Sequence, residues 1–345
     1  MKILLTGGTG FLGRAALAGL ENLGQVHVLS RRKGLDLHGD LTRWNAGLNL
    51  DQIVNEKFDI LIHLAALYDL KANQVSCYKN NLLGTSNALK LAQILKIPRF
   101  INASSVAASV NVDKEFINGI KLPVQPYDLN LLGSFPDPYS ESKALAEQQI
   151  KNWQGIPLKI NLRFGMLVGD TRNGEIDRID GPYYAPQIMK SMRRWMEALP
   201  TSVPMPGASG TRLPLVPVDI AANALTQFAM WAMAQTCAEA ESQYQSFHLV
   251  PREGLSLMKL YRSTLKHCKI KTKGLFLVEK SPLAVTEFLA QHMARFPKEA
   301  LNYLLQFPRY ENQDTSRILG KNWCPEFEVY EKAFWSGYEK NVSNS

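Results

Sequence analysis

The distribution of apolar and polar residues along the first half of the chain predicts strands that alternate with helices. FDILIHL, at Phe58–Leu64, is almost continuously apolar, which is typical of a strand buried on both faces of a sheet. QVHVLS, at Gln25–Ser30, alternates like a strand, whereas Leu82–Leu95 and Tyr139–Trp153 have a helical period. Further strands are expected at Lys2–Thr6, Arg99–Ala103 and Leu158–Phe164. This order predicts an α/β fold with a doubly wound parallel sheet.

The pattern changes after Gly165, where a stretch rich in glycine, proline and aromatic residues begins. Two strands are then expected at Leu213–Val218 and Phe247–Val250, with a helix starting at Asp219 between them. From Pro251 onward the pattern is helical and amphipathic. We therefore expect four segments: a nucleotide-binding core at 1–168, a substrate loop region at 169–212, a return to the core at 213–250, and a mainly helical substrate-binding region at 251–345.

Composition narrows the class of protein. The chain has 345 residues, of which 46% are hydrophobic, which is enough for a large core. No apolar run is long enough for a membrane span or a signal peptide, and the four cysteines show no CxxC pairing. We therefore expect a cytoplasmic protein with neither disulfides nor a bound metal. A net charge of +8 could attract nucleic acid, anionic lipid or a phosphorylated small molecule, but no nucleic-acid-binding motif accompanies it, so we do not expect nucleic acid as a partner.

TGGTGFLG, at Thr6–Gly13, lies between the first predicted strand and the first predicted helix. Glycines at this place allow a tight turn and close approach of the backbone to a pyrophosphate, which the helix N-terminus then binds. The position of the motif predicts a dinucleotide site in a Rossmann-type sheet. The residues expected to contact the dinucleotide here are Gly7, Thr9, Gly10, Phe11, Leu12 and Gly13.

The end of the second strand indicates which dinucleotide is bound. A carboxylate there would bind the 2′-hydroxyl of NAD, but the chain has Arg31 and Arg32, which suit a 2′-phosphate. NADP(H) is therefore the expected cofactor. Asp40 and Leu41 are expected at the adenine edge, although Asp40 also fits an ordinary turn. Later strand ends complete the expected cofactor-binding set with Leu64, Ala65, Ala66, Phe164 and Met166.

Tyr139 and Lys143 are four residues apart at the start of a predicted helix, and therefore share one helix face. A nearby ammonium lowers the pKa of a phenol, which suits proton transfer. One unit earlier, Ser104 and Ser105 follow a predicted strand, where a hydroxyl can donate to a developing oxyanion. We expect Ser105 in this role, with Ser104 as the alternative that could contact the substrate. His63 is interpreted as a core residue of its strand.

These motifs, together with HLAA at His63–Ala66 and NLLGT at Asn81–Thr85, resemble an extended short-chain dehydrogenase/reductase. The resemblance implies that Tyr139 is the acid/base, that Lys143 also holds the nicotinamide ribose, and that Ser105 contacts the substrate carbonyl. It also implies that Asn81 belongs to the proton relay.

A narrower resemblance covers nearly the whole chain. GDLT at Gly39–Thr42, GDTRNGEIDRIDGPYY at Gly169–Tyr184 and LNYLLQFPRYENQDTSRILG at Leu301–Gly320 look like the reductase module of bacterial fatty acyl-CoA reductases. The resemblance implies reduction of an acyl thioester, bound to CoA or to a carrier, to an aldehyde and then, as an open second step, to an alcohol. Tyr183 and Tyr184 are expected to contact the substrate. Phe164 departs from the family, which usually has proline there.

Several alternatives stay open at this stage. A reductase of lipid-like ketones, aldehydes or hydroxysteroids would use the same catalytic residues, and a nucleotide-sugar epimerase or dehydratase would share the fold. A non-catalytic regulator that binds NADP would not need the catalytic residues Ser105, Tyr139 and Lys143. The acids of the 169–184 stretch either shape substrate entry or pair with Arg172 and Arg178. Amphipathic segments at 282–296 and 300–307 fit a core, an acyl tunnel or peripheral membrane contact, and a homodimer is common in the family.

Overall fold

The chain divides into two compact units in a computed structural model that describes residues 1–69, 72–114, 116–117, 120–237, 242–278 and 307–343. The sheet unit comprises Met1–Leu167, Val216–Arg252 and Tyr310–Cys324. The second unit comprises Val168–Leu215, Glu253–Arg309 and Pro325–Ser345. The amphipathic segment at 282–296, and that at 300–307 except for Phe307, lie outside the described residues.

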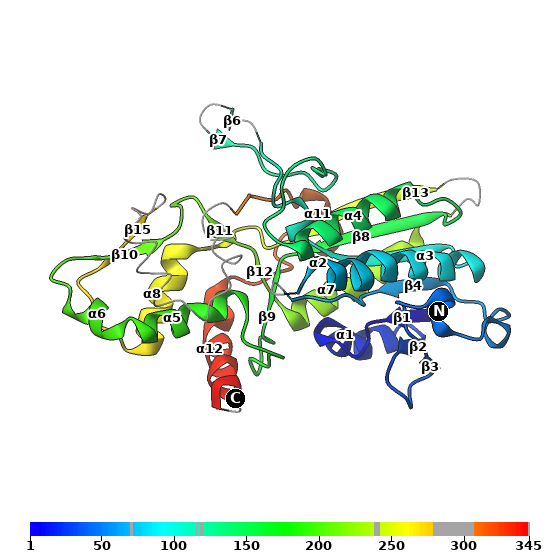
Figure 1. Ribbon diagram of the computed structural model, residues 1–345, viewed down its shortest axis with the longest axis horizontal. Helices are drawn as coiled ribbons and strands as arrows, with labels where there is room; N and C mark the ends of the chain where they lie inside the picture. Colours follow the sequence, from blue (N-terminus) through cyan, green and yellow to red (C-terminus); the bar gives the residue numbers. More distant parts are fainter. Residues whose placement is uncertain (70–71, 115, 118–119, 238–241, 279–306, 344–345) are drawn as a thin grey trace. The chain divides into compact units, whose positions relative to one another are not determined.

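The sheet unit is built on a seven-stranded parallel sheet, which confirms the predicted fold class (Figure 1). Because all seven strands are parallel, their carboxyl ends lie at one edge of the sheet. The strands, in spatial order, are β13 (Gln243–Leu249), β8 (Leu158–Phe164), β5 (Arg99–Ser105), β4 (Ile60–His63), β1 (Lys2–Thr6), β2 (Gln25–Ser30) and β3 (Leu37–His38).

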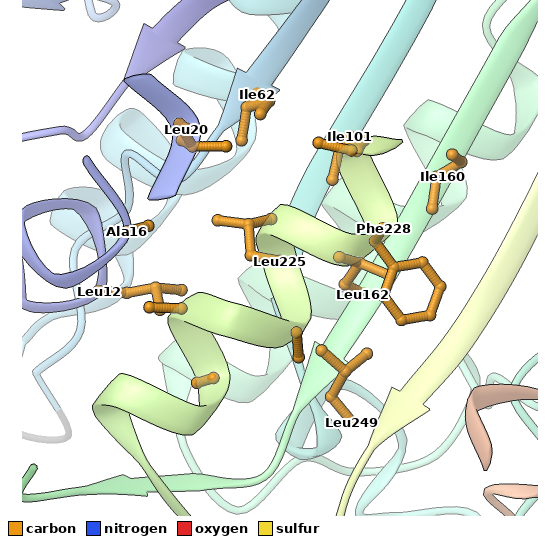
Figure 2. Packing of buried hydrophobic residues seen from close by; sticks show 14 of the residues in the cluster. Leu12, Ala16, Leu20, Ile62, Ile101, Ile160, Leu162, Leu225, Phe228 and Leu249 are labelled. Atoms are coloured by element: carbon orange, nitrogen blue, oxygen red, sulfur yellow. The ribbon is translucent and has the colours of Figure 1, made fainter. Parts of the chain in front are cut away.

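Two pairs of helices cover the two faces of this sheet. On one face α1 (Phe11–Glu21) contacts α7 (Val218–Ala234), and on the other α3 (Gly84–Ile94) contacts α4 (Pro138–Asn152). Figure 2 shows Leu225 and Phe228 of α7 against the strands. The shorter elements of the unit are η1 (Trp44–Gly47), η2 (Leu50–Gln52), α2 (Gln74–Cys77), the π-helix η3 (Tyr78–Leu83), η4 (Val106–Ser109), β6 (Phe116–Ile117), β7 (Ile120–Lys121) and α11 (Gln313–Leu319).

The second unit contains more strand than the sequence predicted. β15 (Leu275–Val278) pairs with β10 (Val203–Pro206), and β14 (Leu255–Ser256) pairs with β11 (Arg212–Leu213). β9 (Met166–Val168) pairs with β12 (Leu215–Pro217) where the chain passes from one unit to the other. The elements of the second unit are η5 (Gly181–Tyr183), α5 (Tyr184–Ser191), α6 (Arg193–Ala198), β10 (Val203–Pro206), β11 (Arg212–Leu213), β14 (Leu255–Ser256), α8 (Leu257–Cys268), β15 (Leu275–Val278) and α12 (Phe327–Ser343).

The segment Tyr310–Cys324 differs from the sequence analysis, which placed all of 251–345 in one helical region. In the structure this segment returns to the sheet unit, where Ile318 and Leu319 of α11 contact the apolar cluster under α7. The Thr315 hydroxyl donates to the carbonyl of His248, 2.7 Å away, at the end of β13. No helix among the described residues is long and apolar enough to cross a membrane.

Candidate active site

The glycine turn after β1 has the shape that a dinucleotide requires. Gly7 has a φ of 75°, and a Cβ on it would lie 2.4 Å from the Ala65 nitrogen, while a Cβ on Gly13 would lie 2.2 Å from the Gly7 carbonyl oxygen. These two glycines are therefore required by packing of the protein on itself. A Cβ on Gly10 would lie 3.3 Å from the Gly7 oxygen and would meet nothing else within 4 Å, so packing restricts this position less than it restricts Gly7 and Gly13. Its missing side chain leaves the N-terminus of α1 accessible to an anion.

Thr9, Phe11 and Leu12 complete this turn. The carbonyl of Thr9 accepts a hydrogen bond of 2.9 Å from Arg14, and Leu12 belongs to the apolar cluster under α1. No side chain caps the first turn of α1, and that turn contains no acidic residue. The helix therefore keeps its N–H groups for a pyrophosphate, which fits a dinucleotide cofactor.

Arg31 and Arg32 follow β2 directly and are exposed. Asp40, in the turn after β3, accepts a hydrogen bond of 2.9 Å from the Thr42 backbone. Burial acts to raise the pKa of Asp40, but its hydrogen bonds with Thr42 and the charges of Arg31 and Arg43 lower it overall. Asp40 therefore has the contacts of a turn residue and carries its charge close to Arg31, while Leu41 packs beside the cluster under α3.

The end of β4 lies directly beside the glycine turn. The Leu64 nitrogen donates to the Thr6 carbonyl at 3.0 Å, and the Ala65 backbone contacts Gly7, so Ala65 and Ala66 continue past the turn. His63 makes side-chain hydrogen bonds with Thr6 at 2.8 Å and with Thr85 at 3.1 Å. Burial, together with the charge of Lys143, lowers the pKa of His63 to about 3. These contacts confirm the interpretation of His63 as a core residue.

Tyr139 and Lys143 lie on the first turns of α4, as the spacing predicted. The helix begins after Asp137, whose carboxylate accepts a hydrogen bond of 2.8 Å from the Ser140 nitrogen, and Pro138 occupies the first helical position. The Lys143 ammonium donates to the Ala103 carbonyl of β5 at 2.9 Å. Burial lowers the pKa of Lys143 to about 8, although the nearby Glu147 carboxylate opposes this shift. Lys143 can therefore titrate close to neutral pH.

Ser104 and Ser105 have different environments at the end of β5. Ser104 is buried, and its hydroxyl donates to Glu147 at 2.5 Å. Ser105 is partly exposed, and its oxygen accepts a hydrogen bond of 3.2 Å from the Ala107 nitrogen, which leaves its own hydroxyl hydrogen for another acceptor. The arrangement favours Ser105 over Ser104 as the residue that contacts a substrate oxygen.

Asn81 lies in the π-helix η3 and is buried against α4. Its amide nitrogen donates to the Leu67 carbonyl at 3.0 Å and to the Ser142 hydroxyl at 2.9 Å, while its oxygen accepts from the Leu67 nitrogen at 2.7 Å. Ser142 lies between Tyr139 and Lys143 in the sequence. Asn81 therefore connects the loop after β4 to the helix that carries both residues, and π-turns of this kind are frequent at functional sites.

The other expected residues have simpler environments. Phe164 ends β8 and is buried in the apolar cluster under α7, in register with Ser105. Met166 begins β9 and is partly exposed. The side-chain rings of Tyr68 and Tyr139 meet edge-on, 5.0 Å apart between centroids. Tyr68 is exposed and was not expected at the site from the sequence.

Tyr183 and Tyr184 belong to the second unit. Tyr183 is buried, its hydroxyl accepts from the Gly169 nitrogen at 2.9 Å, and its ring stacks on Phe334 of α12 at 4.2 Å. This is the environment of a core residue with no exposed surface for a substrate, whereas Tyr184 is partly exposed. Gly174 and Gly337 allow the loop to approach α12, since a Cβ on Gly337 would lie 1.6 Å from the Gly174 oxygen.

Two of the four acids in the 169–184 loop pair with arginines of the same loop. Asp170 binds Arg172 at 2.6 Å, and Asp180 lies 3.5 Å from Arg178. Within the described part of the chain, no group of three or more histidine, cysteine or acidic side chains could hold a metal ion. The loop is thus held by internal ion pairs and by its contact with α12.

Sequence reasoning missed a buried network next to the catalytic residues. The carboxylate of Glu147, one turn after Lys143, accepts hydrogen bonds from Arg163 of β8 at 2.6, 2.9 and 3.0 Å. Arg163 also donates to His248 of β13 at 3.3 Å, and His248 donates through Nδ1 to the Glu311 carbonyl at 2.9 Å. The alternation of LKINLRF in β8 was a signal for polar side chains on one face, but it gave no sign that they were buried.

Comparison with known proteins identifies the family of the chain. A profile of the NAD-binding family described as Male sterility protein matches residues 21–225. The fatty acyl-CoA reductase wat of Drosophila melanogaster is 23% identical over 297 residues, which cover 70% of this chain and 56% of the relative. The 2-alkyl-3-oxoalkanoate reductase of Stenotrophomonas maltophilia is 30% identical over 159 residues, covering 44% of this chain and 46% of the relative. The chain thus spans about half the length of these two relatives.

Among solved structures, the terminal R domain from the myxalamid PKS-NRPS biosynthetic pathway superposes with a TM-score of 0.71. It is 22% identical, and the alignment covers 99% of this chain and 90% of that domain. The fold is therefore shared by this chain and that domain.

A parallel nucleotide-binding sheet with serine, tyrosine and lysine at one edge defines the class: an NAD(P)-dependent oxidoreductase of the extended short-chain dehydrogenase/reductase type. Within that class the chain belongs to the male sterility protein family, whose profile matches more than half of its length.

Proposed function

We propose that the chain catalyses the NADPH-dependent reduction of a fatty acyl thioester to an aldehyde. The observation that carries this proposal is the sequence similarity to a fatty acyl-CoA reductase, which extends over 70% of the chain. The sheet unit supports it, because Ser105, Tyr139 and Lys143 all belong to that unit and Lys143 is bonded to β5, the strand that ends at Ser105. The acyl chain would arrive on CoA or on a carrier protein.

The residues of the chain divide the chemistry between them. The nicotinamide cofactor supplies the hydride when it is bound. The Ser105 hydroxyl donates to the carbonyl oxygen of the substrate, and Tyr139 donates a hydrogen bond and then a proton to the same oxygen. The Lys143 ammonium favours the phenolate that Tyr139 becomes. One hydride and one proton convert the thioester to an aldehyde and a free thiol, and a second pair would convert the aldehyde to an alcohol.

The choice of NADPH rests on the two arginines that follow β2. Arg31 and Arg32 are exposed at the position where a ribose 2′-phosphate is recognised in this fold. A guanidinium binds a phosphate through paired, charge-assisted hydrogen bonds. The charge of Arg31 also extends to Asp40, whose pKa it helps to lower, so this side of the turn combines both signs of charge.

A single assay tests the proposal. Purified protein is incubated with NADPH and hexadecanoyl-CoA, and NADPH loss and free thiol are measured in the same tube. Loss of NADPH with release of thiol supports the proposal, at one NADPH per thiol for the aldehyde and two for the alcohol. If hexadecanoyl-CoA causes no NADPH loss and no release of thiol, while hexadecanal is reduced in a separate assay, the proposed reduction of the thioester is contradicted.

A second candidate substrate is a ketone. The similarity to a 2-alkyl-3-oxoalkanoate reductase is higher in identity, 30%, although it covers only 44% of the chain. The same serine, tyrosine and lysine would act on a ketone, but no thiol would be released. NADPH loss with a 2-alkyl-3-oxoalkanoate, and none with the thioester, would favour this candidate.

A further inference from the structure

The end of β5 is held by three side chains around Ser105. Lys143 donates to the carbonyl of Ala103 at 2.9 Å, and the Ser104 hydroxyl donates to Glu147 at 2.5 Å. On the other side of Ser105, the Tyr310 hydroxyl donates to the carbonyl of Val106 at 3.1 Å. Both neighbours of Ser105 are thus fixed by hydrogen bonds, one from α4 and one from the segment that returns to the sheet unit.

Tyr310 is itself well anchored. Its backbone forms an isolated parallel β-bridge with Val124. The backbone nitrogen of the next residue, Glu311, donates to the Val124 carbonyl at 2.9 Å. The Tyr310 ring meets the ring of His248 edge-on, with centroids 5.0 Å apart. Burial raises the pKa of the Tyr310 hydroxyl, so the phenol stays neutral and keeps its proton for the bond to Val106. A side chain held in this way fixes the position of the backbone that it binds.

The same returning segment also connects to the other side of Ser105. The carbonyl of Glu311 accepts from His248, His248 accepts from Arg163, and Arg163 is paired with Glu147, the acceptor for Ser104. Arg163 and Glu147 are each only 1% exposed, so this pair is shielded from water. Two chains of hydrogen bonds therefore connect the returning segment to the neighbours of Ser105. One runs from Tyr310 to Val106, and the other runs from Glu311 through His248, Arg163 and Glu147 to Ser104.

We propose that Tyr310 is a positioning residue, which fixes the strand end so that the Ser105 hydroxyl is aimed at the substrate oxygen. This inference rests on the role given to Ser105 in the proposed function. A donor in an oxyanion site contributes most when its position is fixed before the reaction, and small displacements of such groups cost large factors in rate. Loss of the bond to Val106 would therefore lower turnover more than it lowers substrate binding.

Tyr310→Phe removes only the hydroxyl and keeps the ring against His248. Tyr261→Phe is a matched control, because Tyr261 is also a buried phenol that donates to a backbone carbonyl, that of Pro206 at 2.8 Å, but in the second unit. We expect kcat of Tyr310→Phe to fall about tenfold with KM within about twofold of wild type. Turnover by Tyr261→Phe should stay close to wild type, although both variants lose one buried hydrogen bond.

Hydrogen exchange gives a reading that needs no substrate. The peptide over residues 103–109 should exchange faster in Tyr310→Phe than in wild type, and at the wild-type rate in Tyr261→Phe. Turnover is measured with NADPH and either hexadecanoyl-CoA or hexadecanal, whichever the wild-type protein reduces. Unchanged exchange at 103–109 in Tyr310→Phe would overturn the inference by itself.

A double-variant comparison separates this inference from the proposed function. In a Ser105→Ala background, Tyr310→Phe should cause no further loss of kcat, because Tyr310 acts through Ser105. If Ser105→Ala turns over like wild type, the role proposed for Ser105 is wrong. If Ser105→Ala is slow while Tyr310→Phe keeps wild-type kcat, the role of Ser105 stands and the positioning role of Tyr310 is wrong.

Discussion

The two faces of strands β5, β8 and β13 are both buried, yet they differ in chemistry. Toward α7 the strands present apolar side chains, including Ile101 and Ile160, which belong to one cluster with Phe228 (Figure 2). Phe247 of β13 also contacts Phe228, with ring centroids 4.9 Å apart. The opposite face has polar side chains in register across the three strands. These cross-strand rows are Ser104–Arg163–His248 and Asn102–Asn161–Ser246.

The difference separates stability from orientation. The apolar face stabilises the fold by removing side-chain area from water, with little dependence on direction. The polar face contributes hydrogen bonds that are directional, at the cost of burying a charged pair. The row Ser104–Arg163–His248 is the one nearest to Ser105 and Lys143. Its directional hydrogen bonds therefore lie next to the residues proposed to transfer the proton. The comparison predicts that the two faces respond differently to substitution.

The largest effect is expected at Tyr139, which lies on α4, a helix that contacts β5 and β8. Tyr139→Phe removes the proposed proton donor and should lower kcat about a thousandfold, since general acid–base catalysis contributes on this order. NADPH binding, measured by fluorescence titration, should stay within about twofold of wild type. Turnover within tenfold of wild type would contradict the assignment of Tyr139.

Stability should fall by similar amounts when either face is disrupted. Phe228→Ala leaves a cavity under α7, which typically costs about 3–5 kcal/mol. Arg163→Met leaves Glu147 buried without its cation, for which about 3–5 kcal/mol is also typical. Urea unfolding followed by circular dichroism measures both. A loss under about 1 kcal/mol for Arg163→Met would show that the buried pair is dispensable for stability.

A smaller effect on activity than that of Tyr139→Phe is expected when the cofactor preference is changed. Replacing Arg31 and Arg32 together by alanine removes the expected partners of the 2′-phosphate, so kcat/KM for NADPH should fall by about tenfold to a hundredfold. The value for NADH should stay nearly constant, because NADH lacks that phosphate. An equal loss with both cofactors would place the arginines outside the 2′-phosphate site.

The smallest effect concerns pH. Lys143 is charged below its pKa of about 8, so kcat/KM should decline as pH rises through this value. The negative charge of Glu147 raises that pKa, and Glu147→Gln should therefore move the alkaline limb to lower pH. A limb that stayed in place, or moved to higher pH, would show that Lys143 does not control it.

Much of the sheet unit could be predicted from sequence, because local patterns determine it. The glycine turn, the strands at Gln25–Ser30 and Leu158–Phe164, and the spacing of Tyr139 and Lys143 all involve residues close together in the chain. A sequence with these patterns has few alternatives to a doubly wound parallel sheet, which is why the fold class was confirmed.

The remaining features depend on residues that are far apart in the chain. The bonds from Tyr310 to Val106 and from Glu311 to His248 join positions 204 and 63 residues apart, which no local pattern encodes. In β8 the alternation of Lys159, Asn161 and Arg163 indicates polar side chains on one face of a strand, but it does not distinguish a face in solvent from a buried network. Tyr183, expected beside the substrate, is buried because α12 covers it.

The most direct test of the contrast between the two faces is the turnover of Arg163→Met and Phe228→Ala, measured with NADPH and the carbonyl compound that wild type reduces. Both variants are assayed at a temperature where circular dichroism shows them folded. The account predicts that kcat falls about tenfold for Arg163→Met and stays within about twofold for Phe228→Ala. Equal kcat values for the two variants would contradict a special role of the polar face in catalysis.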